Sequence, residues 1–184
     1  PANASLEGYI YPDTYRITAD SDLSTVLTKS FDEFSKVIAE NKIEPALASH
    51  GLNLYQGITL ASIVQKEVTN TDDQRNVAQV FYNRLANDMP LGSDVTFIYG
   101  ASLLGVEATP SLDSPYNTRI NKGLPPGPVS NFNLSALLAV ANPAPNNYLY
   151  FVAGDGDDAG KTFYSTTLEE HEANVKAHCK TLCQ

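Results

Sequence analysis

The sequence has few basic residues, few cysteines and no long apolar run, and each shortage excludes a class of function. Its 12 lysines and arginines face 21 acidic residues, a formal net charge of −9. Nucleic acids and anionic membrane surfaces are bound through Lys and Arg, so we expect neither as a partner. No stretch reaches the roughly 18–20 apolar residues of a membrane span, and no signal peptide opens the chain. A neutral or mixed-charge ligand, such as a glycan, stays open.

The two cysteines, Cys179 and Cys183, lie four residues apart near the C-terminal end. Oxidation is conceivable in an exported protein, but this spacing is not that of a disulfide framework. His178 is adjacent, so a metal site is conceivable as well, although no second ligand cluster accompanies it. We therefore expect two tail thiols without a chemical role, and no metal site.

Hydrophobic spacing predicts several helices in a chain whose 184 residues, 42% of them hydrophobic, suffice for one sizeable core. Asp22 is placed to cap the first helix, and Gly51 to end a short second one. Capping boxes begin at Thr71, where the pattern is Thr-Asp-Asp-Gln, and at Thr167. The expected helices cover about 23–38, a short piece before 51, 59–68, 72–88, 132–141 and 167–182.

The rest of the pattern predicts extended segments and loops. Residues 6–17 indicate an extended segment, and residues 148–153 and 161–165 indicate two strands. The Asp/Gly-rich loop between these strands lacks EF-hand spacing, which favours a hairpin over a calcium site. Residues 90–130 are rich in Gly and Pro and predict a long irregular stretch that carries function. The expected fold class is α+β: helices packed with a small, mostly antiparallel sheet, and an irregular loop region forming a cleft.

One acidic residue, Glu67, lies where solvent is not expected. It follows Leu60, Ile63 and Val64 at helical spacing and so shares the apolar stripe of its helix. Burial of an ionised carboxylate is costly and raises its pKa, as a general acid near neutral pH requires. The alternative is that Glu67 lies at the rim of the core or pairs with a base such as Arg84.

Other catalytic chemistries have less support. The sequence contains no Gly-x-Ser-x-Gly, Walker loop, GxGxxG or HExxH motif. The three histidines, His50, His171 and His178, are scattered among predicted helices and are not expected to bind metal. No cofactor is expected.

The local sequences together resemble the MltG-like (YceG-like) endolytic murein transglycosylases over residues 6–175. The segment Leu60-Ala-Ser-Ile-Val-Gln-Lys-Glu67 is similar to the family's helix with the catalytic glutamate. Further matches stand in the family's order: Glu7–Tyr15, Val80–Leu85, Leu91–Asp94, Ile98–Gly100, Ser114–Thr118, Gly123–Pro128, Ala141–Pro143, Tyr148–Val152 and Glu170–His171.

This resemblance implies a lyase that cleaves the MurNAc–GlcNAc β-1,4 bond without water and leaves 1,6-anhydroMurNAc ends on nascent glycan strands. Glu67 would be its single general acid/base. The implied substrate-binding residues are Ser93, Asp94, Tyr116, Asn117, Thr118 and His171. Tyr116 could stack on a sugar ring and Asp94 stabilise positive charge on it. For Asn117 and Thr118 the alternative is that they hold the irregular backbone, and His171 is expected to orient a loop or a carboxylate.

Three positions depart from the family's pattern: Gln65 stands for a common Glu, Gly92 for Gln and Val95 for Pro. We expect residues 1–184 to form one catalytic domain. The chain begins with Pro1, so we expect a fragment of a longer protein that lacks an upstream membrane anchor and LysM-like segment. The resemblance places that protein at the extracytoplasmic face of the bacterial membrane, with peptidoglycan strands and synthesis machinery as partners.

Two alternatives stay open. One is a non-catalytic peptidoglycan-binding module of the same fold. The other is an aminodeoxychorismate lyase, which needs a pyridoxal phosphate lysine. Lys66 points off the apolar stripe and no Gly-rich phosphate loop accompanies it, which argues against the lyase.

Overall fold

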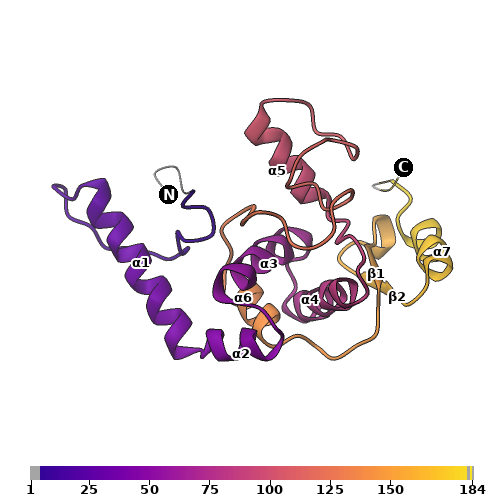
Figure 1. Ribbon diagram of the computed structural model, residues 1–184, viewed down its shortest axis with the longest axis horizontal. Coiled ribbons are helices and arrows are strands. Elements are labelled where there is room, and N and C mark those ends of the chain that lie inside the picture. Colours follow the sequence, from indigo (N-terminus) through magenta and orange to yellow (C-terminus); the bar gives the residue numbers. More distant parts are fainter. Residues whose placement is uncertain (1–4, 182, 184) are drawn as a thin grey trace.

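Seven α-helices and one two-stranded antiparallel sheet form the described part of the chain, residues 5–181 and 183, in the computed structural model (Figure 1). The α+β class is confirmed: the chain is mostly helical, and its sheet has two strands. None of the described helices is long and apolar enough to cross a membrane. In chain order the elements are α1 Leu23–Glu40, α2 Ile43–Ser49, α3 Leu54–Glu67, α4 Thr71–Ala86, α5 Asp94–Leu104, α6 Leu134–Ala141, β1 Tyr150–Ala153, the 3₁₀ turn η1 Gly156–Asp158, β2 Thr162–Ser165 and α7 Leu168–His178.

The core lies where α3, α4 and α6 pack together, with α2 beneath them and α1 to one side (Figure 1). The middle of α3 is inside: its residues from Gly57 to Val64 are buried. A helix that is apolar on all sides must be surrounded by other elements. The helix that ends at Glu67 is therefore anchored in the core.

Two of the three predicted N-terminal helix caps are confirmed, and one is wrong. The side chains of Asp22 and Thr167 cap α1 and α7. Thr71 does not cap α4, because Asn70 does so one residue earlier and accepts hydrogen bonds from two backbone amides. Gln74, the expected partner in the box, is buried instead and bonds to Val68 O and the Ser135 hydroxyl.

Residues 90–130 were predicted to be a long irregular stretch dominated by turns, but they contain one helix that was not predicted, α5. Its sequence, DVTFIYGASLL, is poor in strong helix formers, so propensity gives little signal. Tertiary packing stabilises the helix: Gly100 lies against Ser114, where an added Cβ would stand 2.5 Å from Oγ. The remainder of the stretch consists of turns, as predicted.

The C-terminal part differs from prediction in its cysteines. The β1–β2 hairpin, with Tyr150 opposite Ser165, is confirmed. Cys179 and Cys183, however, form a disulfide rather than two thiols. The chain leaves α7 after His178, short of the predicted end at Leu182, a residue outside the described ones. Asp155 accepts the amides of Lys180 and Thr181, and this turn brings the cysteine Cα atoms to 5.6 Å, within disulfide range.

Helix α3 begins at Leu54, five residues before the predicted Thr59, with Asn53 and Gln56 as a capping box. Gly57 hides this start, since glycine interrupts an apolar pattern. Its lack of a side chain has a packing reason: a Cβ there would lie 2.2 Å from Leu47 Cδ1 on α2.

We therefore expect Gly57→Ala to destabilise the fold by about 1–3 kcal/mol through overpacking, despite alanine's better helix propensity. Thermal unfolding followed by circular dichroism would measure it. Combined with Leu47→Ala, the cost should be clearly less than the sum of the two single changes. An unchanged or raised Tm for Gly57→Ala would contradict the close α2–α3 contact.

Candidate active site

Glu67 is the last residue of α3, where the helix leaves the core and reaches the surface. The helix is buried as far as Val64, Lys66 is exposed, and Glu67 keeps partial contact with solvent. Its carboxylate accepts a hydrogen bond of 2.5 Å from the Ser93 hydroxyl to Oε1. A carboxylate held at the end of a rigid helix, with one face open, is placed to act on a bound molecule.

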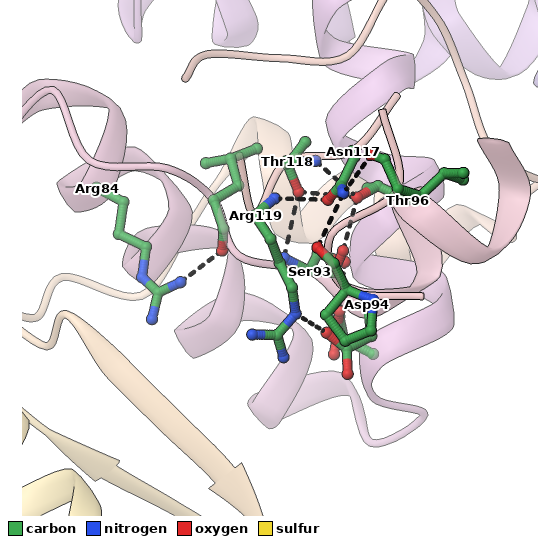
Figure 2. A network of polar contacts seen from close by, with 11 residues as sticks. Arg84, Ser93, Asp94, Thr96, Asn117, Thr118 and Arg119 are labelled. Atoms are coloured by element: carbon green, nitrogen blue, oxygen red, sulfur yellow. Dashed lines mark hydrogen bonds and ion pairs between the residues drawn. The ribbon is translucent and has the colours of Figure 1, made fainter. Parts of the chain in front are cut away.

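Ser93 stands at the N-cap of α5, yet its side chain makes no capping bond and turns to Glu67 instead. A network of hydroxyls fixes it there, as Figure 2 shows. The Ser93 amide donates to Thr118 Oγ1 at 3.2 Å, and the Thr96 hydroxyl donates to Ser93 O at 2.6 Å. The two threonine hydroxyls lie 2.9 Å apart. The site thus joins α3 to a loop 26 residues later.

Asp94 and Arg119 form an exposed ion pair at the edge of this network, with 2.5 Å between Oδ1 and Nε (Figure 2). The Asp94 charge raises the pKa of Glu67, and the Arg119 charge lowers it. Asp94 is therefore close enough to influence the Glu67 carboxylate, and it is itself paired with Arg119.

Asn117 and Thr118 are fully buried and use their side chains within the loop. The Asn117 amide donates to Pro110 O and Leu112 O, and its oxygen accepts the Arg119 amide two residues on, as in an Asx turn. This geometry favours the alternative in which both residues hold the irregular backbone. Direct substrate contact by either stays a prediction.

Tyr116 lies away from the Glu67 carboxylate, on a cavity of about 630 Å³ that Tyr9, Tyr55 and Pro128 also line. Its ring packs against Tyr99 with the ring centroids 4.9 Å apart. Stacking of Tyr116 on a sugar therefore concerns a part of the surface distinct from the carboxylate itself.

Arg84 supports the site from behind instead of forming an ion pair with Glu67. Its guanidinium donates to Leu91 O at 2.5 Å and to Leu149 O at 2.6 Å, and no Arg84–Glu67 bridge within 4 Å occurs among the described residues. It also lies 5.3 Å from the centre of the Tyr150 ring. Arg84 therefore ties the Ser93 loop to the hairpin.

The Tyr150 ring, which the Arg84 guanidinium approaches, also stacks on the ring of His171. The ring centroids of Tyr150 and His171 are 5.3 Å apart. Burial and the Arg84 charge lower the pKa of His171, while Glu172 opposes them. Its Nδ1 is buried and has no hydrogen-bond partner within the described residues. The structure thus places the His171 ring against Tyr150, and the expected role in orienting a loop or a carboxylate stays a prediction.

The net effect of these surroundings is a raised pKa for Glu67. Burial is the largest cause; the Asp94 charge adds to it, and the Ser93 hydrogen bond and the Arg84 and Arg119 charges oppose it. A carboxyl group that keeps its proton nearer neutral pH is suited to general acid catalysis.

A cavity of about 190 Å³ adjoins Glu67, between the α3–α4 turn and the β-hairpin. Lys66, Thr69 and Asp73 line one side, and Gly160, Lys161 and Thr162 line the other. Sequence reasoning missed Asp73 and Lys161, since an acid in a first helical turn and a lysine in a hairpin carry no special signal. No group of three or more His, Cys, Asp or Glu suited to a metal occurs among the described residues.

The raised pKa has a consequence for stability that can be measured. A carboxyl group whose pKa is higher in the folded chain stabilises it fully only below the unfolded pKa, and this contribution is lost as pH rises through the folded pKa. Glutamine is always neutral, so Glu67→Gln should raise Tm at pH 8, where it removes the cost of burying an ionised carboxylate. Each kcal/mol of unfolding free energy gained in this way corresponds to about 2–4 °C in Tm. Near pH 4 the gain should be small.

Thermal unfolding from pH 4 to 8 would test this, with Glu107→Gln as an exposed control that should show no such trend. A Tm for Glu67→Gln that falls relative to the original chain as pH rises would show that the ionised carboxylate is the stabilised form.

Comparison with known proteins gives consistent matches. Residues 1–177 match the YceG-like family. An endolytic murein transglycosylase of Streptococcus pneumoniae (strain D39) is 37% identical over 96% of this chain and 33% of its own length. One from Bacillus subtilis (strain 168) is 34% identical over 90% of this chain and 46% of its own length. A crystal structure of a yceG-like protein from Listeria monocytogenes superposes with a TM-score of 0.79 at 38% identity, covering 91% of this chain and 55% of that one. The chain thus spans about a third to a half of these relatives.

Proposed function

The chain belongs to the YceG-like family, and from this premise we propose that it carries the catalytic site of an endolytic murein transglycosylase, with Glu67 as general acid and base. The observation that carries the proposal is the Glu67 carboxylate itself. It stands at the open end of a buried helix, with its pKa raised by burial and its orientation fixed by Ser93. Relatives of this chain bear the name of that activity.

The proposed reaction cleaves the MurNAc–GlcNAc β-1,4 bond in two proton transfers. Protonated Glu67 donates its proton to the glycosidic oxygen as the bond from that oxygen to C1 of MurNAc breaks. The ionised carboxylate then accepts the proton of the MurNAc C6 hydroxyl as O6 bonds to C1. A 1,6-anhydroMurNAc end and a free GlcNAc hydroxyl result, and Glu67 regains its proton without water being consumed.

A single carboxylate suffices for this reaction because the second nucleophile belongs to the substrate. Glycosidases that add water use two carboxyl groups, spaced for a nucleophile or for a water molecule. Asp94, the expected second carboxylate, is paired with Arg119. We assign it a supporting electrostatic role on the developing positive charge, rather than proton transfer.

The remaining expectations extend this proposal to the whole protein. We propose that it acts on nascent glycan strands at the extracytoplasmic face of the bacterial membrane, beside the peptidoglycan synthesis machinery. The acidic surface, with a formal charge of −9, is compatible with a glycan ligand and disfavours a nucleic acid.

Glu67→Gln should abolish glycan cleavage while leaving the fold intact, because glutamine fills the same space but cannot cycle a proton. General acid/base catalysis alone is worth about 10² to 10⁴-fold, so we expect a loss of at least that size. Digestion of purified sacculi, followed by separation of the released muropeptides, would measure it, with Glu107→Gln as a control that keeps full activity.

Mass spectrometry of the same digests tests the reaction class. Anhydromuramyl ends are lighter by one water, about 18 Da, than hydrolysed ends, because the C6 oxygen replaces water as nucleophile. Reducing ends in their place would show a muramidase, and anhydromuropeptides released by Glu67→Gln would remove Glu67 from the catalytic role.

A further inference from the structure

The cavity beside Glu67 contains a second carboxylate, Asp73, for which the proposed reaction has no use so far. Asp73 comes from the first turn of α4 and lines the cavity together with Glu67. The Tyr164 hydroxyl, on β2, donates to Asp73 Oδ1 at 2.7 Å. This bond joins the Asp73 side chain on α4 to the hairpin.

Only half of this carboxylate is used within the protein. Oδ1 accepts from Tyr164, whereas Oδ2 has no hydrogen bond within the described part of the chain. An ionised carboxylate offers about four lone-pair sites and can accept only. Oδ2 can therefore accept a further hydrogen bond from a molecule in the cavity that Asp73 lines.

The other groups around the cavity are polar and of mixed type. Lys66 is exposed beside Glu67 and forms no ion pair or hydrogen bond with the residues that the structure describes. Lys161 reaches the cavity from the hairpin, where it pairs with Asp158. Thr69 and Thr162 add hydroxyls. Such a set of donors and acceptors suits a ring with hydroxyl and amide groups, whereas an anionic ligand would meet the Asp73 charge.

We propose that this cavity is a subsite for the amino sugar next to the bond that is cleaved, and that Asp73 Oδ2 accepts a hydrogen bond from a hydroxyl or the acetamido N–H of that sugar. The inference rests on the proposed function. Asp73 is a substrate-binding residue in it, and Glu67 alone transfers protons. Tyr164 positions Asp73, and through this hydrogen bond the hairpin contributes to the orientation of a substrate-binding residue.

Two substitutions separate the free oxygen from the anchored one. Asp73→Asn can keep its Oδ1 on the Tyr164 hydroxyl but presents an NH₂ donor, in place of an acceptor, to the cavity. Tyr164→Phe removes the anchoring hydroxyl and leaves the carboxylate whole. A role of Asp73 only in holding the hairpin predicts a larger effect for Tyr164→Phe, whereas contact with the sugar predicts a larger effect for Asp73→Asn.

The measurement is KM and kcat on uncrosslinked glycan strands with the purified protein, alongside Tm. A hydrogen bond to a charged group corresponds to a change of about 10- to 100-fold, so Asp73→Asn should raise KM by that factor with kcat within a few fold. Tyr164→Phe should lower Tm and raise KM by about 3-fold or less. Asp72→Asn, an exposed acid one residue away, is the matched control and should match the original protein.

Binding of the same strands to the Glu67→Gln protein, with and without Asp73→Asn, tests the subsite independently of catalysis. Weaker binding, that is a higher Kd, with Asp73→Asn supports the subsite even if the original protein proves inactive. Inactivity of the original protein would reject only the proposed function. Equal KM and Kd for Asp73→Asn and its parent, or a larger effect of Tyr164→Phe, would overturn the inference.

Discussion

The hydrogen bond from Ser93 to Glu67 is the contact on which the rest of the site depends. It joins the end of α3, the described helix with the most buried residues, to the N-cap of α5. Ser93 forgoes its usual capping bond to make it, and the backbone on both sides is held by Thr96 and Thr118. The irregular loop has one rigid point, and that point touches the candidate catalytic carboxylate.

Rigidity reaches this point from two directions. The hydroxyl network holds the loop from within. Arg84, on α4, holds it from outside: its Nη1 donates to Leu91 O, and its Nε donates to Leu149 O, just before β1. A site built from loops needs such support, because catalytic geometry is sensitive to displacements below 1 Å. The buried Asn117, tied to three backbone groups, serves the same purpose.

The sequence allowed prediction of what local pattern encodes. Glu67 on an apolar stripe, the Asp22 and Thr167 caps and the β-hairpin all follow from residues a few positions apart. Helix α5 could not be predicted, because it is stabilised by the contact of Gly100 with Ser114 rather than by propensity. Asn70 caps α4 in place of Thr71, and the Gln74 side chain, the expected partner in the box, bonds to Val68 O and Ser135 instead. Asp73 gave no signal, since its partner Tyr164 lies 91 residues away.

Although the chain as a whole is acidic, several basic residues lie around Glu67. The chain has 12 basic residues; two of them, Arg84 and Arg119, lower the pKa of Glu67, and two more, Lys66 and Lys161, line its cavity. A group that must both give and take a proton in one turnover works best with a pKa near the operating pH. Burial raises the pKa of Glu67, and the two arginines and Ser93 oppose it only in part, so Glu67 holds its proton more firmly than an exposed glutamate does.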